Sequence, residues 1–452
     1  MEDDYDKKTK ANFIAIWLIY HQMYSCIVML GSIQGNIKDP SNLSYLAGTN
    51  DLGLGMLAAG GLIVGMISTF IFGYYHEKIA EKYSRKKFFM GTNLIWIACC
   101  FLRAFSPNFA FFTIVALIGT VGTGAFVPIG FSIIGDSFSP KERGDRFGFM
   151  QVSLLMGGGW GLILGAIFML FGALGWRIVY IVVTILSSMS LILYHRVGID
   201  PERGRVETAF EGFEGAINYD YKITWKNVSQ ILRKKSLLAL LISIFLSGIA
   251  TTTMGLWTIF YFTEFRFNGN HSLATALYIG VMVSSLPGNI VGGRLGDKYF
   301  KEGKLRGRVI VSLGGSFVGI ILQMIFFLMP LSTPIDWIIF ILIGIIQAFL
   351  CSVDVGNRFA IYSEVCAPEL RSTVNSLHIM MANLGGVIGH LVIASMVQVN
   401  PDLMPNAIAL VLTIYLIGST LWIVPYFSYP KEAKECDELL ADRRREIESK
   451  ST

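Results

Sequence analysis

Two charged residues lie in the middle of a long apolar run, the segment IIQAFLCSVDVGNRFAIYSEV at residues 345–365. Asp354 and Arg358 are four residues apart, so on a helix they share one face and can form an ion pair. Gln347 and Cys351 continue that face toward the start of the run. A charge at the centre of a bilayer costs at least ~2.5–3.5 kcal/mol on insertion scales, so charged residues there generally face a cavity and have a function.

Two interpretations of this pair stay open. In the first, Asp354 takes up a proton while Arg358 attracts an anionic group of a solute. In the second, the pair neutralises itself and only makes the helix rigid. We favour the first, because ionisable residues in membrane segments generally mark a substrate or proton pathway.

Polar and aromatic side chains on other apolar runs are further candidates for a binding site. Trp257, Tyr261 and Glu264 follow the spacing i, i+4 and i+7, which suits the wall of a substrate cavity. Tyr261 and Glu264 equally fit an anchor at the membrane surface. His21 and Gln22 lie in the first apolar run, where His21 is either a proton carrier near neutral pH or a hydrogen-bonded packing residue.

The sequence patterns of common enzyme sites are absent. There is no GxxxxGK[ST] phosphate-binding loop, no HExxH and no GxSxG. We therefore predict that the chain is not an enzyme and needs no metal ion or other cofactor.

Membrane-spanning helices must position these candidates. Of the 452 residues, 53% are hydrophobic and only 15% are charged, a balance that soluble domains rarely reach. A spanning helix needs ~20 predominantly apolar residues, and we expect twelve such segments, which makes the chain an all-α membrane protein. Their expected bounds are 13–32, 52–75, 88–105, 109–134, 149–171, 176–194, 237–262, 273–293, 309–329, 337–363, 374–399 and 407–427.

The positive charges indicate how the chain crosses the membrane. Of the 37 lysines and arginines, only Lys38, Arg103, Arg177 and Arg266 fall in one set of alternate loops or at the span ends beside them, and only Arg358 falls deep inside a span. By the positive-inside rule both termini are cytoplasmic. We therefore expect a multi-pass integral protein of the cell membrane. The net charge of +5 reflects topology, and we expect no nucleic-acid partner.

An internal repeat divides the chain in two. DSFSPKER at residues 136–143 and EVCAPELR at residues 364–371 both read acid-x-x-x-Pro-x-x-Arg, at matching places after the fourth and tenth spans. Such repeats are common in transporters. We predict an N-terminal six-helix bundle at 1–194, a central cytoplasmic loop at 195–236, a C-terminal six-helix bundle at 237–427 and a cytoplasmic tail at 428–452.

A second pair of related loops follows the second and eighth spans. EKIAEKYSRKK at residues 77–87 and GGRLGDKYFKEGKLRGR at residues 292–308 each place an acid and a lysine ahead of a basic run. We predict that ion pairs among the repeated charges form a gate on the cytoplasmic side, each pair worth only ~0–1 kcal/mol. The predicted gate residues are Glu81, Lys82, Arg85, Asp136, Arg143, Asp297, Lys298, Glu364 and Arg371.

These loops resemble the signature of the major facilitator superfamily, Gly-x-x-x-acid-basic-x-Gly-basic-basic. Gly293, Asp297 and Lys298 fit it well, whereas Glu77 and Ser84 stand at the glycine places of the first copy. The resemblance covers the whole chain. It implies two pseudo-symmetric six-helix bundles, with the first, fourth, seventh and tenth helices lining a central cavity.

Within that superfamily the chain is similar to the spinster-like lipid transporters. The likeness lies in EKYSRKK, in DPERGRVE from Asp200, in GLW at residues 255–257 and in LRSTVNSLHIMMANLGG from Leu370. Spinster-like proteins usually carry an Asp in the first helix and an Arg and a Glu in the fourth. Gln22, Ala116 and Thr123 stand at those places here, which makes Gln22 and Thr123 candidate site residues.

We therefore predict a secondary active transporter that moves a small or amphipathic organic solute by alternating access, with proton coupling through Asp354. Facilitated uniport is the alternative form of coupling. The spinster likeness and Arg358 favour an anionic amphiphile such as a lysolipid. A soluble organic acid, a drug-like solute and a transporter-like receptor or sensor that moves nothing remain open. The expected partners are the solute, protons and membrane lipids, and the expected state is a monomer.

The predicted topology can be tested by labelling introduced cysteines. Asn42→Cys and Asn270→Cys lie in predicted outer loops, so a membrane-impermeant maleimide added outside the cell should react with both. Lys141→Cys and Lys304→Cys should react only after the membrane is permeabilised. Reaction at position 141 in intact cells would contradict the assignment.

Overall fold

The computed structural model describes residues 2–38, 40, 45–49, 51–80, 84–169, 171–204, 206–210, 229 and 231–451. The chain divides into two compact units. Unit 1 comprises Met1–Ser137 and Val152–Pro201, and unit 2 comprises Phe138–Gln151 and Glu202–Thr452. Residues 138–151 therefore belong to unit 2, although the chain on both sides of them belongs to unit 1.

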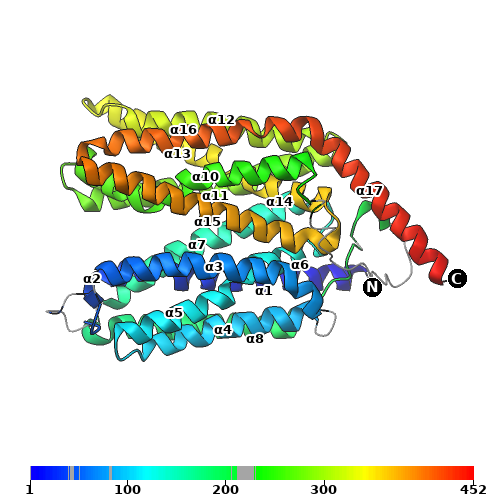
Figure 1. Ribbon diagram of the computed structural model, residues 1–452, viewed down its shortest axis with the longest axis horizontal. Coiled ribbons are helices and arrows are strands. Elements are labelled where there is room, and N and C mark those ends of the chain that lie inside the picture. The colour runs from blue at the N-terminus through cyan, green and yellow to red at the C-terminus, as the bar shows by residue number, and fades with distance from the viewer. Residues whose placement is uncertain are drawn as a thin grey trace. The chain divides into compact units, whose positions relative to one another are not determined.

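Unit 1 is built from helices in its described residues (Figure 1). Ser84 accepts a hydrogen bond from the Lys87 amide at the start of the fourth helix, and Asn108 accepts one from the Phe111 amide at the start of the fifth. These N-caps satisfy amides that a helix start leaves without a partner. In chain order the elements are α1 (Glu2–Val28), α2 (Leu30–Lys38), α3 (Asp51–Ala80), α4 (Arg85–Ala104), α5 (Phe109–Gly124), η1 (Phe126–Gly130), α6 (Phe131–Ser137), most of α7 (Arg143–Met169), η2 (Gly172–Leu174) and α8 (Gly175–Val197).

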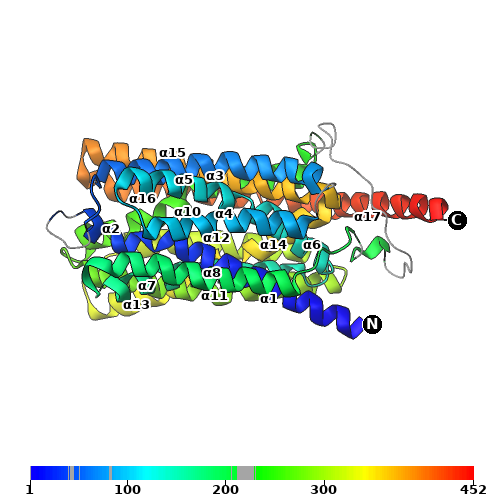
Figure 2. The same ribbon diagram turned by 90° about the horizontal axis from the view of Figure 1, so that it is seen from below.

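Unit 2 contains the first turns of α7 and the remaining helices. They are η3 (Thr208–Phe210), α10 (Lys235–Tyr261), η4 (Phe262–Arg266), α11 (His271–Lys301), α12 (Arg306–Leu328), α13 (Pro334–Cys351), α14 (Asp354–Val365), η5 (Pro368–Leu370), α15 (Arg371–Val399), η6 (Pro401–Leu403), α16 (Met404–Thr420) and α17 (Ile423–Ser451). α17 continues well past the ends of the other helices of its unit (Figures 1 and 2).

Twelve helical segments within the described residues are long and apolar enough to cross a membrane. This result confirms the prediction of an all-helical chain with twelve spans. The surface of α13 shows the pattern that a lipid environment requires, because Ile338, Leu342 and Ile345 are exposed while Phe340 and Gln347 are buried. The apolar side chains cover the outside, and a polar one lies inside.

The fourth and tenth spans, which precede the repeated acidic motifs, are both interrupted. In the fourth span, Phe109–Ser137, the π-helical turn η1 separates α5 from α6. In the tenth, expected as one helix at 337–363, α13 ends at Cys351 and α14 begins at Asp354. The Ser352 hydroxyl donates to the carbonyl oxygens of Phe349 (2.8 Å) and Ser285 (2.9 Å) beside this break. Irregular backbone is tolerated at membrane depth where protein groups surround it.

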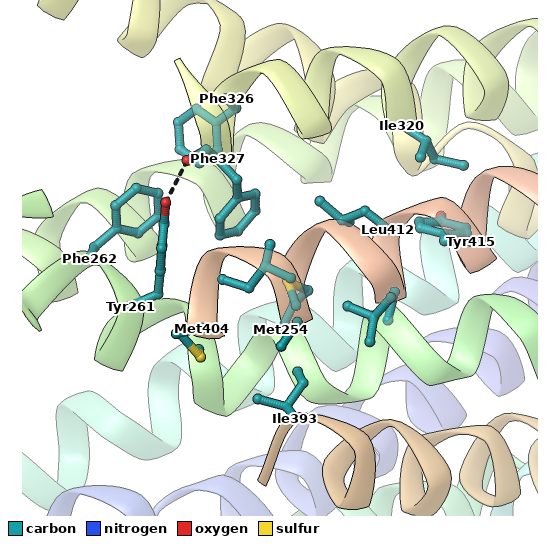
Figure 3. Close-up of a cluster of buried hydrophobic side chains, with 14 of the residues drawn as sticks. Met254, Tyr261, Phe262, Ile320, Phe326, Phe327, Ile393, Met404, Leu412 and Tyr415 are labelled. Carbon is teal, nitrogen blue, oxygen red and sulfur yellow. Dashed lines mark hydrogen bonds between the residues drawn. The ribbon is translucent and has the colours of Figure 1, made fainter. Parts of the chain in front are cut away.

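The apolar core of unit 2 is rich in aromatic rings (Figure 3). Phe326 of α12 stacks on Phe340 of α13 with ring centroids 4.4 Å apart and planes 7° apart. The Tyr261 hydroxyl donates a hydrogen bond of 2.8 Å to the Phe327 carbonyl oxygen. These contacts hold α10, α12 and α13 together, since aromatic pairs contribute about 0.5–1.5 kcal/mol each beyond area burial.

Glycines allow the first turns of α7 to approach α11 closely. A Cβ atom at Gly148 would overlap the Asn289 carbonyl oxygen, and one at Gly293 would overlap the Gly144 carbonyl oxygen. Both obstacles are backbone atoms, which cannot rotate away. Gly293 is the first glycine of the loop signature. The close contact explains why a glycine is needed at this place, because small residues let helix backbones meet.

This contact predicts opposite effects for two alanine substitutions in α11. Gly293→Ala should lower the free energy of unfolding by ~1–3 kcal/mol, because the new methyl group overpacks against the Gly144 backbone. At Gly280 a Cβ would meet nothing within 4 Å, so Gly280→Ala should be neutral or slightly stabilising through helix propensity. Thermal unfolding of the detergent-purified proteins measures both. Equal melting temperatures for the two variants would rule out the close approach.

Candidate functional site

Arg308 connects two of the predicted acids at one end of unit 2. Its guanidinium lies 2.7 Å from the Asp297 carboxylate and 3.1 Å from the Glu364 carboxylate, and it donates to the Pro140 carbonyl oxygen at 2.6 Å. The Arg308 side chain is fully buried. The Tyr429 hydroxyl also donates to Glu364. Arg308 ends the basic run GKLRGR, but its role could not be separated from that of the neighbouring basic residues by sequence alone.

Asp297 also caps the start of α7. Its two carboxylate oxygens accept hydrogen bonds from the backbone amides of Gly144 (3.0 Å) and Asp145 (2.7 Å). A carboxylate at a helix N-terminus is stabilised by the unpaired amides and by the helix dipole. Asp297 is only 5% exposed, so it binds the start of α7 away from water.

In unit 1 the corresponding acid has a corresponding partner. Arg85, the first residue of α4, lies 2.5 Å from Asp136 and 2.8 Å from Asp200. Each repeat therefore pairs the acid at the end of its interrupted span with an arginine at the start of another helix: Asp136 with Arg85, and Glu364 with Arg308. The sequence placed Asp136 and Arg85 in the gate but gave no partner to Asp200.

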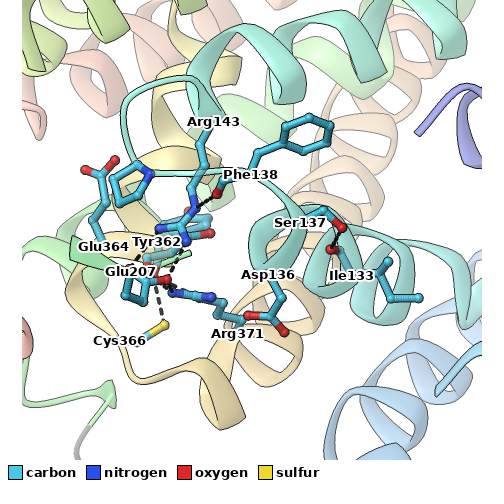
Figure 4. A network of polar contacts seen from close by, with 12 residues as sticks. Ile133, Asp136, Ser137, Phe138, Arg143, Glu207, Tyr362, Glu364, Cys366 and Arg371 are labelled. Carbon is cyan, nitrogen blue, oxygen red and sulfur yellow. Dashed lines mark hydrogen bonds and ion pairs between the residues drawn. The ribbon is translucent and has the colours of Figure 1, made fainter. Parts of the chain in front are cut away.

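Glu207 binds the two arginines of the repeated motif (Figure 4). Its carboxylate forms ion pairs with Arg143, at the start of α7, and with Arg371, at the start of α15. The Arg143 side chain also donates to the Phe138 carbonyl oxygen at 3.0 Å, and Arg371 donates to the Ser363 carbonyl oxygen. All three ionic side chains are at most 3% exposed. We call Glu207, Arg143 and Arg371 the carboxylate clamp.

The electrostatics of the clamp keep Glu207 ionised. Burial alone acts to raise the pKa of Glu207, but the guanidinium groups of Arg143 and Arg371 outweigh it, so the pKa lies below its ordinary value. Glu207 belongs to the motif DPERGRVE, which carried the family resemblance but had no predicted role. The motif itself was the available signal, because it contains both Asp200 and Glu207.

The C-terminal helix α17 contacts both η5, the turn that precedes Arg371, and the segment that carries Glu207. Arg443 binds Glu369 through two hydrogen bonds of 3.0 and 3.1 Å, and Arg444 donates to the Ala209 carbonyl oxygen. Phe210 packs in a small apolar cluster whose other buried members are Cys436, Leu440 and Ile447. The expected tail at 428–452 is thus part of a helix that also contains the end of the twelfth span.

Lys298, Glu81 and Lys82 are the remaining predicted gate residues. Lys298 is exposed and lines an open pocket of about 520 Å³. Glu81 and Lys82 lie outside the described residues. The remaining lining of the pocket consists of Glu142, Asp145, Arg294, Asp297, Lys301 and Glu302.

Asp354 and Arg358 pair as the sequence spacing predicts. Their side chains lie 2.5 Å apart and are 7% and 5% exposed. Asp354 is the first residue of α14, where the helix dipole also favours a negative charge. Arg358 donates to the Leu240 carbonyl oxygen at 3.2 Å, and its guanidinium lies 5.0 Å from the centre of the Trp422 ring.

Tyr362, which hydrogen-bonds Arg358, extends this buried pair toward His378. The Tyr362 hydroxyl lies 3.2 Å from Nδ1 of His378, and the Phe359 ring packs on the same imidazole at 4.7 Å. Gln347 is buried and donates to the Gly344 carbonyl oxygen at 3.1 Å. His378 lies in LRSTVNSLHIMMANLGG, where its spacing from other polar residues indicates no site.

The remaining candidates of unit 2 are divided between two environments. The Trp257 indole donates to Nδ1 of His390 at 3.2 Å, in a half-buried position between α10 and α15. Tyr261 is buried in the aromatic core, where it bonds to Phe327, and Glu264 is exposed. The structure does not bring Tyr261 or Glu264 into contact with the Asp354–Arg358 pair.

Three candidates lie in unit 1. His21 stacks on Trp17 with ring centroids 5.6 Å apart. Gln22 is 7% exposed. The Thr123 hydroxyl donates to the Thr120 carbonyl oxygen within its own helix at 2.9 Å, which leaves it able to accept one further hydrogen bond.

Comparisons with known proteins relate the chain to one family. A family model described as Major Facilitator Superfamily matches residues 13–390. Protein spinster homolog 3 of Homo sapiens is 27% identical over 206 residues, which are 44% of this chain and 38% of that protein. Citrate exporter 1 of Aspergillus niger is 27% identical over 171 residues, 37% of this chain and 32% of that protein. The matched regions span less than half the length of these curated relatives.

A solved structure has the same fold. The crystal structure of the human organic anion transporter MFSD10 aligns with a TM-score of 0.63 over 93% of this chain and 99% of that chain, at 16% identity. At 16% identity this similarity shows a shared fold alone.

The carboxylate clamp predicts a stability effect. Glu207→Gln keeps the size of the side chain but removes the charge that Arg143 and Arg371 share, so the free energy of unfolding should fall by ~3–5 kcal/mol near neutral pH. Because the pKa of Glu207 is lowered, the wild type should lose this contribution only as the pH falls below the ordinary value of 4.5. Thermal unfolding at several pH values measures the difference.

A matched control is the exposed pair of Glu302 and Lys304. Glu302→Gln should leave the melting temperature unchanged, since surface ion pairs contribute little. If Glu207→Gln is as stable as Glu302→Gln at pH 7, the clamp does not stabilise unit 2.

Proposed function

This chain belongs to the Major Facilitator Superfamily, and we propose that it is a secondary active transporter that moves a small or amphipathic organic solute across a membrane by alternating access. The family resemblance found in the sequence is thereby confirmed. The solute, the coupling to protons and the roles of single residues below are parts of the proposal.

The observation that carries the proposal is the Asp354–Arg358 ion pair, buried at the break between α13 and α14. A buried arginine requires a counter-charge. While Asp354 is ionised, it neutralises Arg358. When Asp354 takes up a proton, Arg358 loses its partner and can bind the anionic group of a solute instead. Proton and anion binding thus favour each other, which is the condition for moving both together.

The chemistry around Arg358 suits an amphiphile with an anionic group. Trp422 lies against the guanidinium, so one site offers both a positive charge and an apolar ring face. Trp257 supplies a second aromatic surface with a polar edge. We infer an anionic amphiphile such as a lysolipid, a choice that the similarity to protein spinster homolog 3 supports. His21, Gln22 and Thr123 are proposed to contribute polar contacts from unit 1.

The carboxylate clamp and Asp297 are proposed to form the gate. Residues 138–151 are joined through the chain to unit 1 at both ends, yet Glu207, Asp297 and Arg308 of unit 2 bind them. Alternating access requires relative motion of the two halves of the fold. We propose that these bonds break and form again in each cycle. With the lysine-rich loops inside, this gate and both termini face the cytoplasm of a cell, and the transporter acts as a monomer in the cell membrane.

Substitutions of Asp354 and Arg358 distinguish a role in proton coupling from a purely structural role. Asp354→Asn removes the titratable group, so a pH gradient should no longer drive accumulation, while exchange of solute across the membrane continues. Arg358→Gln should weaken binding of an anionic solute. Uptake into proteoliposomes of a lysophospholipid, a tricarboxylate and a cationic dye, with and without a pH gradient, measures both effects.

Asp336→Asn serves as a control, because Asp336 is the exposed carboxylate that begins the same span; its uptake should match the wild type. The double variant Asp354→Asn/Arg358→Gln contains no stranded charge and should remain folded. If this double variant still accumulates solute with the pH gradient, the pair is scaffolding and the coupling proposal fails.

A further inference from the structure

Two cysteines from separate helices of unit 1 meet in its interior. The sulfur atoms of Cys26 in α1 and Cys100 in α4 lie 3.3 Å apart. Both residues are buried, at 4% and 0% exposure, and both are free thiols. Cys100 also lies 3.7 Å from the Tyr180 carbonyl oxygen of α8. The thiols are thus close enough to share one proton.

Arg103 lies beside this pair, about one turn after Cys100 in α4. Its guanidinium nitrogen is 3.9 Å from the Cys26 sulfur, and its guanidinium carbon lies 6.0 and 5.7 Å from the centres of the Phe112 and Tyr180 rings. In the described part of unit 1, the carboxylates of Asp136 and Asp200 both bind Arg85. Among the unit 1 side chains that the structure describes, these two are the carboxylates, and neither is placed against Arg103.

Arg103 is half-buried and its Nε atom is out of contact with water, so without a carboxylate it favours an anion among the other acids around it. The acidic groups that face it are the thiols of Cys26, Cys99 and Cys100 and the phenol of Tyr180. A thiol is the strongest acid of these types, and a thiolate beside an arginine is a reactive nucleophile. When Cys26 is the thiolate, the Cys100 thiol, which donates to the Tyr180 carbonyl oxygen in the structure, is close enough to donate to Cys26 instead.

We propose that Cys26 and Cys100 form a redox-active dithiol, activated by Arg103, whose substrate is a small hydroperoxide. The Cys26 thiolate attacks the peroxide oxygen, the O–O bond breaks, and sulfenic acid and hydroxide (or alkoxide) form. The Cys100 sulfur then attacks the Cys26 sulfur and expels hydroxide. The Cys100 proton and one proton from solvent convert the two expelled groups into water (or an alcohol) and water. The dithiol is oxidised by two electrons to a disulfide, and the peroxide is reduced.

The disulfide would connect α1 to α4 close to the point where α1 ends. Cys26 lies in the last turn of α1, and the helix is interrupted at Met29 before α2 begins at Leu30. Gln22 is one turn earlier on the same face. Oxidation therefore fixes the end of α1, next to a candidate solute-binding position, against α4.

The test is chemical and independent of transport. Wild-type protein in lipid nanodiscs is treated with hydrogen peroxide at neutral pH, free thiols are alkylated in denaturant, and peptides are analysed by mass spectrometry without reduction. The expected product is a Cys26–Cys100 disulfide. Cys99, the neighbouring buried cysteine, is expected to remain a free thiol during the peroxide treatment and therefore to be recovered in alkylated form. Cys26→Ser and Cys100→Ser should each abolish the cross-link.

The role of Arg103 is tested by rate. Arg103→Gln should slow peroxide-driven cross-linking at neutral pH by about tenfold or more, whereas Arg103→Lys, which keeps the charge, should retain most of the rate. Copper phenanthroline at high pH should cross-link all three proteins, which shows that the geometry is intact. In the wild type the peroxide rate should rise far less than tenfold per pH unit between pH 7 and 9.

Three results would overturn the proposal. One is the absence of a Cys26–Cys100 cross-link in the wild type even with copper phenanthroline. The second is an unchanged peroxide rate in Arg103→Gln. The third needs no variant: a wild-type rate that rises about tenfold per pH unit from pH 7, as for an ordinary thiol.

Discussion

A guanidinium group removed from water must be paired, because its desolvation costs several kcal/mol. Much of the polar architecture of this protein follows from that constraint. Arg308 is held by Asp297 and Glu364, Arg358 by Asp354, and Arg143 and Arg371 by Glu207. In each case the carboxylate comes from a helix end, a helix break or a linker, where the backbone can supply further hydrogen bonds. These pairs therefore fix where helices start, stop and meet.

The same ion pairs also allow the protein to change conformation. A buried ion pair is held strongly while both partners are present, but it is lost when one partner is protonated or takes another counter-ion. Asp354 and Arg358 offer that exchange within one helix. The carboxylate clamp offers it between a linker, the start of α7 and the start of α15, with α17 supporting the linker through Ala209 and Phe210. α14 carries Asp354 and Arg358, and its Ser363 carbonyl oxygen accepts a hydrogen bond from Arg371, so one helix contacts both the proposed solute site and the proposed gate.

The sequence predicted those features that depend on local patterns. Apolar length identified the twelve spans, and the i, i+4 spacing identified the Asp354–Arg358 pair. The break at Ser352–Val353 carries neither proline nor glycine, so nothing local indicated it. Glu207 lies 64 residues from Arg143 and 164 from Arg371, and contacts at such separations depend on tertiary packing that periodicity does not describe. The partner of Glu364 was missed for the same reason.

Proton movement with the solute is the central claim, and it can be measured directly. Wild-type protein is reconstituted into weakly buffered liposomes that contain a pH-sensitive dye, and a gradient of the transported solute is imposed without a pH gradient. The account predicts that the internal pH changes as the solute enters, in a fixed ratio of protons to solute, and that a proton ionophore abolishes the pH change. Solute entry at full rate with a constant internal pH would contradict it.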